Sequence, residues 1–517
     1  MNVLYIMADQ LRWDHLTCAG HPTLRTANLD ALAARGVRFT QAYVNSGVCG
    51  PNRMSHYTGR YPVSHGATWN RVPLSVGEVT LGEYLRSAGL TLALAGKTHV
   101  LPDQAGLKRL QLLEGDSELA TLLARGSFVE VDRYDGHHEP GAESGYPAYL
   151  RRHGYDGKDP WHEHVIATID PQGEVHSGWS MRNVKWPARV AEPHSETAYM
   201  TDQAIGFVQR MGSEPWVLHL SYVKPHWPYV APSPYHAMFT ADQCPPPVRN
   251  QAERENEHPA LAAYRQHEES LSFSTEECVR TVRPVYQGLV QQLDDHLGRL
   301  FEALERQGVL KDTLVIFTAD HGDFLGDHWL GEKELFYDTI QRVPLIVVDP
   351  RPQADATRGR TDDRFVEAVD ILPTILDTLG QPLPMERLEG RSLLPLLHGQ
   401  TPPWRDFVYS ELDYSFRQAR LTLGREPQDC RAFSIRTADW RYVHWLDLPE
   451  QLYDLKADPD QFQDLGREAG TEAVRAAMRD TLLGVLERSK RRVTVDDAYV
   501  AARTNTQHKL GIHFGRW

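Results

Sequence analysis

One cysteine stands immediately ahead of a helix-like run, at a spacing that suits chemistry. Cys49 precedes Pro51 and Arg53, and the run ends at Gly59. Proline is tolerated in the first turn of a helix, so a helix is predicted to begin at this motif. A thiol beside a helix N-terminus and an arginine has a lowered pKa and can act as a nucleophilic thiolate. For an isolated cysteine, the commoner role is that of a small buried residue.

Polar side chains follow two predicted strands where the strands end. The stretch "MADQ" supplies Asp9 and Gln10, and "TADHGD" supplies Asp320 and His321. Ligands of open α/β sheets bind beyond the carboxyl ends of the strands, so both acids should meet at one edge. Two carboxylates, an amide oxygen and an imidazole suit one divalent cation. Each aspartate could instead cap a following helix, but the nearby Cys49 and basic residues favour the metal.

Basic residues recur in the same kind of place. "AGKTH" ends one predicted strand with Lys97 and His99, and "YVKPHWP" ends another with Lys224 and His226. Residues two positions apart lie on one side of an extended chain. "LGEKELFYD" adds Lys333. Such groups can clamp a tetrahedral oxyanion and transfer protons, although a single Lys-x-His pair is usually a solvated loop.

Alternating strands and helices must position these side chains. Strands are predicted in NVLYIM, LTLALAGKTH, PWVLHLSYVKPHWPY, DTLVIFTADHGD and VPLIVVDP, and helices over residues 28–36, 80–89 and 286–308. The first helix is expected to have an Asn28 cap and a Gly36 stop. This order predicts an α/β fold with a large mixed, mostly parallel sheet covered by helices on both faces.

Two other parts of the chain differ in composition and in the predicted secondary structure. Residues 107–193 are rich in Gly, Pro, His and Asp, and are predicted to be long loops over the sheet edge that line the substrate. Short aromatic strands, a helix over 471–489 and a polar tail follow the large domain. We predict a catalytic domain over 1–395 and a smaller domain with an antiparallel sheet over 396–517.

Composition excludes several classes of protein. The chain has 517 residues, of which 41% are hydrophobic and 24% charged, and its net charge of −14 argues against binding nucleic acid or anionic membranes. No apolar run reaches the roughly eighteen residues of a membrane helix. The N-terminal apolar run lacks a basic lead and a cleavage site, so a cytoplasmic protein is expected. The five cysteines form neither a disulfide framework nor a zinc knuckle.

Together these motifs resemble a known family. "CGPNRMSHYTGR" resembles the sulfatase signature, and "MADQLR", "AGKTH", "KPHWPY", "TADHGDFLGDH" and "VDILPTILDTLG" extend the likeness over nearly the whole chain. The resemblance is to formylglycine-dependent sulfatases of the alkaline phosphatase superfamily, in particular the arylsulfatase, phosphonate monoester hydrolase and choline sulfatase branches. It implies a large α/β domain followed by a smaller C-terminal sheet.

The resemblance also implies a role for the cysteine motif. A formylglycine-generating enzyme would read Cys49, Pro51 and Arg53 in the unfolded chain and oxidise the cysteine. The hydrated aldehyde would then attack sulfur or phosphorus in line, and its second hydroxyl would later be deprotonated to release the acid. The metal and lysine side chains would carry the charge.

Carried over position by position, the resemblance implies three groups of residues. The metal ligands would be Asp9, Gln10, Asp320 and His321; the catalytic residues Cys49, Arg53, Lys97, His99, His226 and Lys333; and the substrate-binding residues Asn70 and Lys224.

The resemblance implies an anionic ester as substrate and leaves two classes of ester open. The "GKTH" pair is typical of sulfatases, which indicates hydrolysis of sulfate monoesters of the arylsulfatase type. Gln10 and His321 are instead similar to the phosphonate monoester hydrolase and choline sulfatase branches, so phosphonate monoesters or phosphodiesters are the alternative. A histidine ligand moves the metal preference from Ca²⁺ toward Mn²⁺. An inactive binding protein is a remote alternative, because Cys49, Arg53 and the acids are all present. The polar tail predicts a homodimer or homotetramer.

Overall fold

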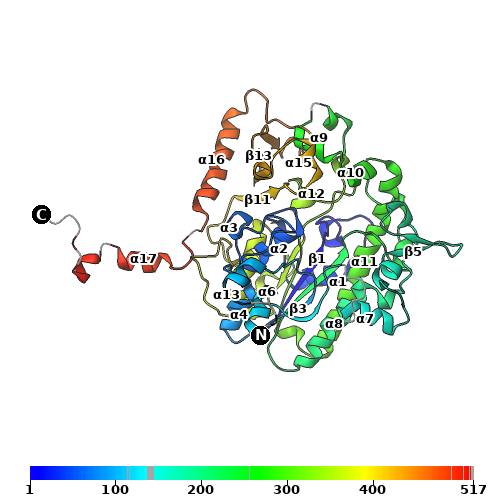
Figure 1. Cartoon of the computed structure of the whole chain (residues 1–517), viewed down its shortest axis with the longest axis horizontal. Coiled ribbons are helices and arrows are strands. Elements are labelled where there is room, and N and C mark those ends of the chain that lie inside the picture. Colours follow the sequence, from blue (N-terminus) through cyan, green and yellow to red (C-terminus); the bar gives the residue numbers. More distant parts are fainter. Residues whose placement is uncertain are drawn as a thin grey trace.

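An eight-stranded sheet forms the centre of the computed structural model (Figure 1). The structure describes the chain except residues 113, 114, 116, 137–144, 256, 491, 505, 512 and 514–517, and the side chains of 507 and 508. The strand order is β10-β2-β9-β8-β1-β7-β3-β4, and β9 is antiparallel to both of its neighbours. The strands are β1 Asn2–Asp9, β2 Val37–Tyr43, β3 Leu92–Gly96, β4 Val129–Arg133, β7 Val217–Pro225, β8 Thr313–Ala319, β9 Leu345–Val348 and β10 Arg360–Glu367.

Helices cover both faces of this sheet, as predicted (Figure 1). One face carries α1 (Ala27–Arg35), α8 (Glu196–Met211) and α11 (Glu276–Arg306), and the other carries α2 (Cys49–Thr58), α4 (Leu81–Ser87) and α13 (Ile371–Thr378). The central strands β1, β7 and β8 are buried along their whole length, which requires apolar cover on both sides. Shorter helices of this part are α3 Pro62–His65, α5 Gln104–Arg109, α6 Glu118–Ala124, α7 Gly145–Arg152, α9 Pro259–Tyr264, α10 Glu268–Phe273, α12 Asp338–Gln341 and α14 Leu394–Leu397.

A separate four-stranded antiparallel sheet lies above the large sheet in Figure 1. Its strands are β11 Phe407–Asp413, β12 Arg431–Thr437, β13 Trp440–Trp445 and β14 Gln451–Asp454. The helix α16 (Glu472–Arg488) packs on β12 and β13, and α15 (Gln418–Thr422) packs on α9. The N–H of Glu411 donates to the carbonyl of Asn45 just ahead of α2, which joins this sheet to the cysteine helix (2.8 Å).

Several elements differ from the sequence prediction. The strands β2, β4 and β10 were not predicted. Helix α11 begins ten residues earlier than expected: the predicted helix began after Pro284, but in the structure this proline lies inside the helix. Asn28 does not cap α1; its side chain donates to Asp294, and Gly36 has an extended conformation.

The region 107–193 is not all loop. It contains α6, α7, the sheet strand β4 and a hairpin of β5 (Ala167–Ile169) with β6 (Val175–Ser177), although residues 113, 114, 116 and 137–144 lie outside the described part. The polar tail, as far as the structure describes it, contains the helix α17 (Asp497–Arg503), which extends away from the body in Figure 1.

The strand register brings the two predicted acids together. Ala8 of β1 pairs with Ala319 of β8, so Asp9 and Asp320 leave neighbouring strands at the same level. On the next strands, β7 ends at Pro225 and β3 at Gly96, immediately before Lys97. Gly96 has a φ of 112°, and a Cβ there would lie 1.9 Å from the carbonyl oxygen of Ser221. Only glycine therefore lets β3 approach β7 at this point.

Three buried histidines, His56, His65 and His219, lie within the helix α2 or close to it. Burial, together with the charge of Arg53, lowers the pKa of His56 and of His219 to about 3. Burial lowers the pKa of His65 to about 3 as well. His219 stacks on Tyr5 with ring centroids 4.3 Å apart. Both ring nitrogens of His56 are buried without a hydrogen-bond partner among the described residues. These histidines are therefore neutral in the folded protein.

Acid should destabilise this fold in the window below pH 6.5. The unfolded chain binds protons on these histidines near pH 6.5, whereas the folded chain does so only near pH 3, so the free energy of unfolding falls as the pH drops through 6.5. At pH 5 each histidine should cost about 2 kcal/mol relative to pH 8.

Urea denaturation of the variant His56→Phe between pH 8 and pH 5 tests this. The variant should lose less stability than the parent protein over that range, because one proton-binding difference is removed. The exposed His153→Gln is the control and should keep the parent's pH dependence. Equal pH dependence in His56→Phe and the parent would contradict the prediction.

Candidate active site

A buried arginine joins the two carboxylates at the strand ends. The Nε of Arg53 donates to Asp320 (2.8 Å) and its Nη2 to Asp9 (3.1 Å), and all three side chains are fully buried. Its Nη1 donates to the carbonyl of Lys97, which follows β3, and to the hydroxyl of Ser221 in β7. The guanidinium therefore fixes the relative positions of four strands and the helix α2.

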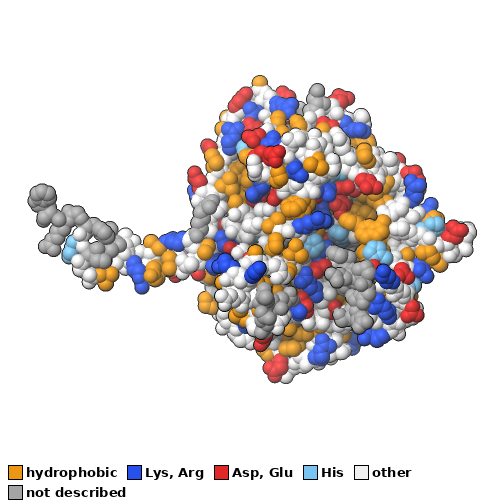
Figure 2. All heavy atoms as spheres, in the orientation of Figure 1, with side chains coloured by type: hydrophobic (Ala, Val, Ile, Leu, Met, Phe, Trp, Pro, Cys, Tyr) orange, Lys and Arg blue, Asp and Glu red, His pale blue; other side chains and the backbone are white. Residues whose placement is uncertain are grey.

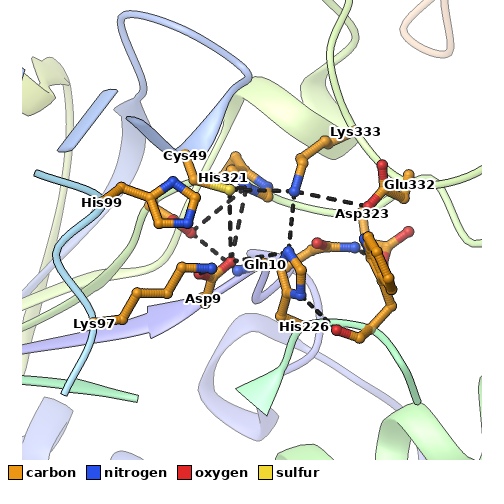
Figure 3. A network of polar contacts seen from close by, with 12 residues as sticks. Asp9, Gln10, Cys49, Lys97, His99, His226, His321, Asp323, Glu332 and Lys333 are labelled. Carbon is orange, nitrogen blue, oxygen red and sulfur yellow. Dashed lines mark hydrogen bonds and ion pairs between the residues drawn. The ribbon is translucent and has the colours of Figure 1, made fainter. Parts of the chain in front are cut away.

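Cys49 lies at the centre of the polar network in Figure 3. Its Sγ is 3.0 Å from Nε2 of His321, 3.2 Å from Nζ of Lys333 and 4.0 Å from Asp9. Burial raises the pKa of the thiol, but the positive charges of Lys333 and His321 lower it, and the resulting pKa lies below the usual value of a cysteine. Position 49 is therefore adapted to hold a negatively charged group.

The two predicted Lys-x-His pairs meet at this point. Nζ of Lys97 lies 2.6 Å from Asp9, and Nε2 of His226 lies 3.1 Å from Nζ of Lys333. Burial, with Lys97 adding repulsion, lowers the pKa of His99 well below its usual value. Burial and the charge of Lys333 do the same for His226. Both imidazoles are therefore neutral near pH 7.

Hydrogen bonds assign the tautomers of these two histidines. Nδ1 of His99 lies 3.3 Å from the amide oxygen of Asn70, which also accepts the N–H of Gly50 (2.7 Å). An oxygen only accepts, so Nδ1 carries the hydrogen and Nε2 of His99 keeps a lone pair. Nδ1 of His226 donates to the carbonyl of Trp227 (2.6 Å), so its Nε2 accepts from Lys333.

Lys224 is placed differently from the other cations. Its Nζ donates to the carbonyls of Pro228 (2.7 Å) and His226 (3.2 Å) and lies 3.5 Å from Glu196. Burial lowers its pKa. These contacts make Lys224 a support for the loop that carries His226.

Within the described part of the chain, the side-chain amide of Gln10 is hydrogen-bonded through its nitrogen but not through its oxygen. Its Nε2 donates to Asp323 (2.6 Å) and lies 3.4 Å from the hydroxyl of Tyr229, which itself donates to Asp323 (2.7 Å). The Oε1 of Gln10 is buried without a hydrogen-bond partner among the described residues. Asp323 thus orients the amide, and it leaves the oxygen available as a metal ligand.

The donor set fits a divalent cation. Asp9, Cys49, Asp320 and His321 each offer a ligand atom, and these atoms lie within 4.8 Å of one another. The free amide oxygen of Gln10 is an orphaned buried acceptor beside them, which a cation would satisfy. Asp9, Gln10, Asp320 and His321 could together hold the ion.

A cleft of about 900 Å³ opens over these residues. Lys97, His99, His226 and Lys333 line its floor, and Trp69 and Phe416 stack face to face in its wall with ring centroids 6.0 Å apart. Figure 2 shows histidine and basic side chains together near the centre of the viewed face. The cleft can therefore receive an anion with an apolar substituent.

Sequence reasoning missed the residues that hold the others in place. Asp323 orients Gln10, Asp135 accepts the N–H groups of Thr98 and His99, and Asn52 donates to the carbonyl of Asp320. Asp323 and Asn52 lie inside quoted motifs, so their proximity to the ligands was the available signal. No comparable signal marks Asp135, which reaches the site only because β4 adds to the sheet edge beside β3.

Comparison with known proteins places the chain in a family. A model of the sulfatase family matches residues 1–381, and one described as the C-terminal part of N-sulphoglucosamine sulphohydrolase matches residues 326–488. The chain belongs to the sulfatase family. This confirms the family and the fold expected from the sequence, and the chain is an enzyme of the sulfuric ester hydrolase class at the level of that family.

Three relatives show how far the likeness extends. A multifunctional alkaline phosphatase superfamily protein of Trinickia caryophylli is 34% identical over 93% of both chains. An arylsulfatase of Clostridium perfringens is 26% identical over 90% of both. The phosphonate monoester hydrolase structure from Agrobacterium radiobacter has a TM-score of 0.81 at 29% identity, covering 94% of this chain and 96% of that one.

Members of this family generally use a metal ion and formylglycine, and the group at Asp9, Cys49, Asp320 and His321 is compatible with both. Among the residues that the structure describes, no helix is long and apolar enough to cross a membrane.

Metal affinity should depend on Asp323 even though it is not a predicted ligand. In Asp323→Asn the new amide can donate to Oε1 of Gln10, which would turn the Gln10 amide and withdraw its oxygen from the ion. We expect metal to bind about 10- to 100-fold more weakly, measured by competition with a chromophoric chelator. Tyr229→Phe is the control, because Asp323 still holds the amide, and its affinity should stay within about threefold. Parent affinity in Asp323→Asn would refute this role.

Proposed function

We propose that this enzyme hydrolyses sulfate monoesters of the arylsulfatase type, using formylglycine made from Cys49. The observation that carries the proposal is the position of Cys49, within 3.2 Å of both His321 and Lys333 and beside Asp9. Position 49 lies directly beside basic groups that line the cleft, and these groups converge on it (Figure 3). Once formed, formylglycine would supply a hydrated aldehyde as the nucleophile.

The cations of the site would hold the anionic ester. Arg53 and Lys97 balance the carboxylates of Asp9 and Asp320. The Lys333 ammonium, which contacts Cys49 and His226, would face the negative charge of the ester together with a bound divalent cation. A fixed charge in a buried site stabilises the developing oxyanion more strongly than water does.

The two neutral histidines would have different tasks. Nε2 of His99 keeps a lone pair near position 49, which suits a base that removes a proton from the nucleophile. Nε2 of His226 accepts from Lys333, so it orients that ammonium toward the leaving group. Lys333 would then donate to the departing oxygen, while Asn70 holds the His99 ring.

Phosphonate monoester or phosphodiester hydrolysis is the alternative. It is supported by the structural likeness to a phosphonate monoester hydrolase and by the Gln10 and His321 ligands. The mixed oxygen and nitrogen donor set suits either Ca²⁺ or Mn²⁺. An inactive binding protein is disfavoured by the complete set of site residues. A formylglycine-generating enzyme as maturation partner and a cytoplasmic location remain predictions.

Cys49 should be essential and its modification measurable. Cys49→Ala should lose at least about 1000-fold in turnover of 4-nitrophenyl sulfate while keeping its unfolding midpoint. In the parent protein, activity should rise with the fraction of the Cys49 peptide that carries the aldehyde by mass spectrometry. Cys244→Ala, which changes a half-buried cysteine outside the site, is the control and should keep activity. Full activity in protein with an intact Cys49 thiol would sink the mechanism.

The two substrate classes can be separated on the same sample. The parent protein should turn over an aryl sulfate at least as well as an aryl phosphonate monoester with the same leaving group, with both detectable. If the phosphonate were cleaved far faster, phosphonate monoester hydrolysis would be the better description.

The C-terminal arm is proposed to bind a second copy of the chain. It leaves the body in Figure 1, and Tyr499, Val500 and Leu510 are exposed along it. Arg60 and Arg387 hold the chain near the start of the arm by donating to the carbonyls of Lys490 and Val493. Light scattering on protein truncated after Thr494 should give a smaller particle than the dimer or tetramer expected of the full chain. An unchanged mass would rule out the arm.

A further inference from the structure

A second cavity of about 760 Å³ adjoins the cleft of the reaction centre. The loop 178–182, the loop 227–229, the helix α10 and the first turns of α11 line it. Five residues line both cavities: Trp179, Trp227, Pro228, Glu332 and Arg417. None of the predicted catalytic or metal-binding residues lines the second cavity, which we call the side chamber. It is therefore a separate space that opens from the same cleft.

A series of aromatic rings leads from the reaction centre to the side chamber. The ring of His226 stacks on Trp227 with centroids 5.3 Å apart and an interplanar angle of 25°. Trp227 in turn meets the edge of Trp179, with centroids 5.0 Å apart. A flat leaving group that departs beside His226 would pass along these rings. Contacts of this kind favour an aromatic substituent.

Two buried polar atoms at the junction of the cavities lack hydrogen-bond partners. Among the described residues, nothing hydrogen-bonds to Nε1 of Trp227 or to Oε1 of Glu332. That oxygen forms an ion pair with Nζ of Lys333 at 3.7 Å, which is beyond hydrogen-bond distance. Buried polar groups are almost always satisfied in folded proteins. Both atoms belong to residues on the walls that the two cavities share.

The charge of the side chamber is negative. Four glutamates line it, at positions 268, 269, 277 and 332, against Arg182 and Arg417. Arg417 is already paired with Glu269 and with Glu334 (3.0 Å to the latter). In the part of the chain that the structure describes, neither Glu268 nor Glu277 forms an ion pair. Figure 2 shows acidic and hydrophobic side chains side by side near α10.

Glu268 and Glu277 also lie in the first turns of α10 and α11, where carboxylates favour helix formation. That role does not remove their charge from the chamber. A cation inside would meet two carboxylates without competing ion pairs, and the faces of Trp179 and Trp227 would attract it as well. An anion there would be repelled.

We propose that the side chamber binds the far end of the ester's leaving group, and that this leaving group is extended, aromatic and terminated by a basic amine. The inference rests on the proposed ester hydrolysis and adds the class of alcohol. The anionic group would bind over Lys97 and Lys333, the aromatic part along Trp227 and Trp179, and the amine among Glu332, Glu268 and Glu277. Opposite charges at the two ends would fix the direction in which the substrate lies.

Four synthetic esters test the proposal. The short probe is 4-nitrophenyl sulfate, and the three long probes are biphenyl-4-yl sulfates with an aminomethyl, a hydroxymethyl or a carboxylate group at the 4′ position. At low salt, kcat/KM should be at least about tenfold higher for the amine than for the carboxylate, with the alcohol between them. Salt should shrink the difference. Equal values for the amine and the carboxylate would overturn the proposal.

Two variants and one matched control locate the effect in the side chamber. The double variant Glu268→Gln and Glu277→Gln should reduce the preference for the amine to about threefold or less, while Glu276→Gln should leave it unchanged, because Glu276 pairs with Arg249 and does not line the chamber. Thr281→Trp should fill the chamber and lower kcat/KM at least tenfold for the long probes only. Its unchanged turnover of the short probe would show that it folds.

The outcomes separate the two proposals. If the short probe and its phosphonate counterpart are both inert with fully modified protein, the proposed function fails. If the short probe is hydrolysed but Thr281→Trp handles long and short probes like the parent protein, the side chamber does not bind the leaving group and only this inference fails.

Discussion

The pairing of one buried guanidinium with two carboxylates is the interaction on which the rest of the site depends. Asp9 and Asp320 end neighbouring strands and would repel each other in a buried site without a cation between them. Arg53 reaches both from α2, and its Nη1 donates to Lys97 just after β3 and to Ser221 within β7. Removing one partner of such a buried pair typically costs about 3–5 kcal/mol, and lysine lacks the planar fork that makes these contacts. The helix with the nucleophile position is therefore aligned with the sheet by the same contacts that set the charge of the site.

The sequence was sufficient for the parts of the molecule that depend on local signals. Strands β1, β3, β7 and β8 are apolar runs that end at or within one residue of Asp9, Lys97, Lys224 and Asp320, and parallel order then brings those ends together. The sequence was insufficient where tertiary contacts determine whether a segment forms a strand or a helix. The strand β10 has exposed polar residues at its start and forms only because β2 offers an edge, and β4 is a partly exposed edge strand. The predicted helix began after Pro284, so the first ten residues of α11 were missed, although α11 continues through that proline.

The same distinction applies inside the site. Residue types at strand ends could be assigned to a reaction, but the orientation of an amide or an imidazole depends on partners that are distant in sequence. Asp323 is 313 positions from Gln10 and Asn70 is 29 from His99, and no spacing rule connects them. The side chamber is lined by two loops, the helix α10 and the first turns of α11, so its shape and charge can vary while the strands and their charges stay fixed. Reaction chemistry and substrate choice thus rest on different layers of the structure.

The burial of α2 has a consequence for how the enzyme is made. All ten residues from Cys49 to Thr58 are buried, and Arg53 is locked between two carboxylates. A modifying enzyme that must contact the cysteine, proline and arginine has no access to them once the chain has folded. Under the proposed mechanism, oxidation of the cysteine and folding therefore compete for the same newly made chain, and the outcome for each molecule is irreversible. Molecules that fold before oxidation would be stable and correctly folded but permanently inactive. The specific activity of a preparation would therefore reflect the relative rates of cysteine oxidation and folding during its synthesis.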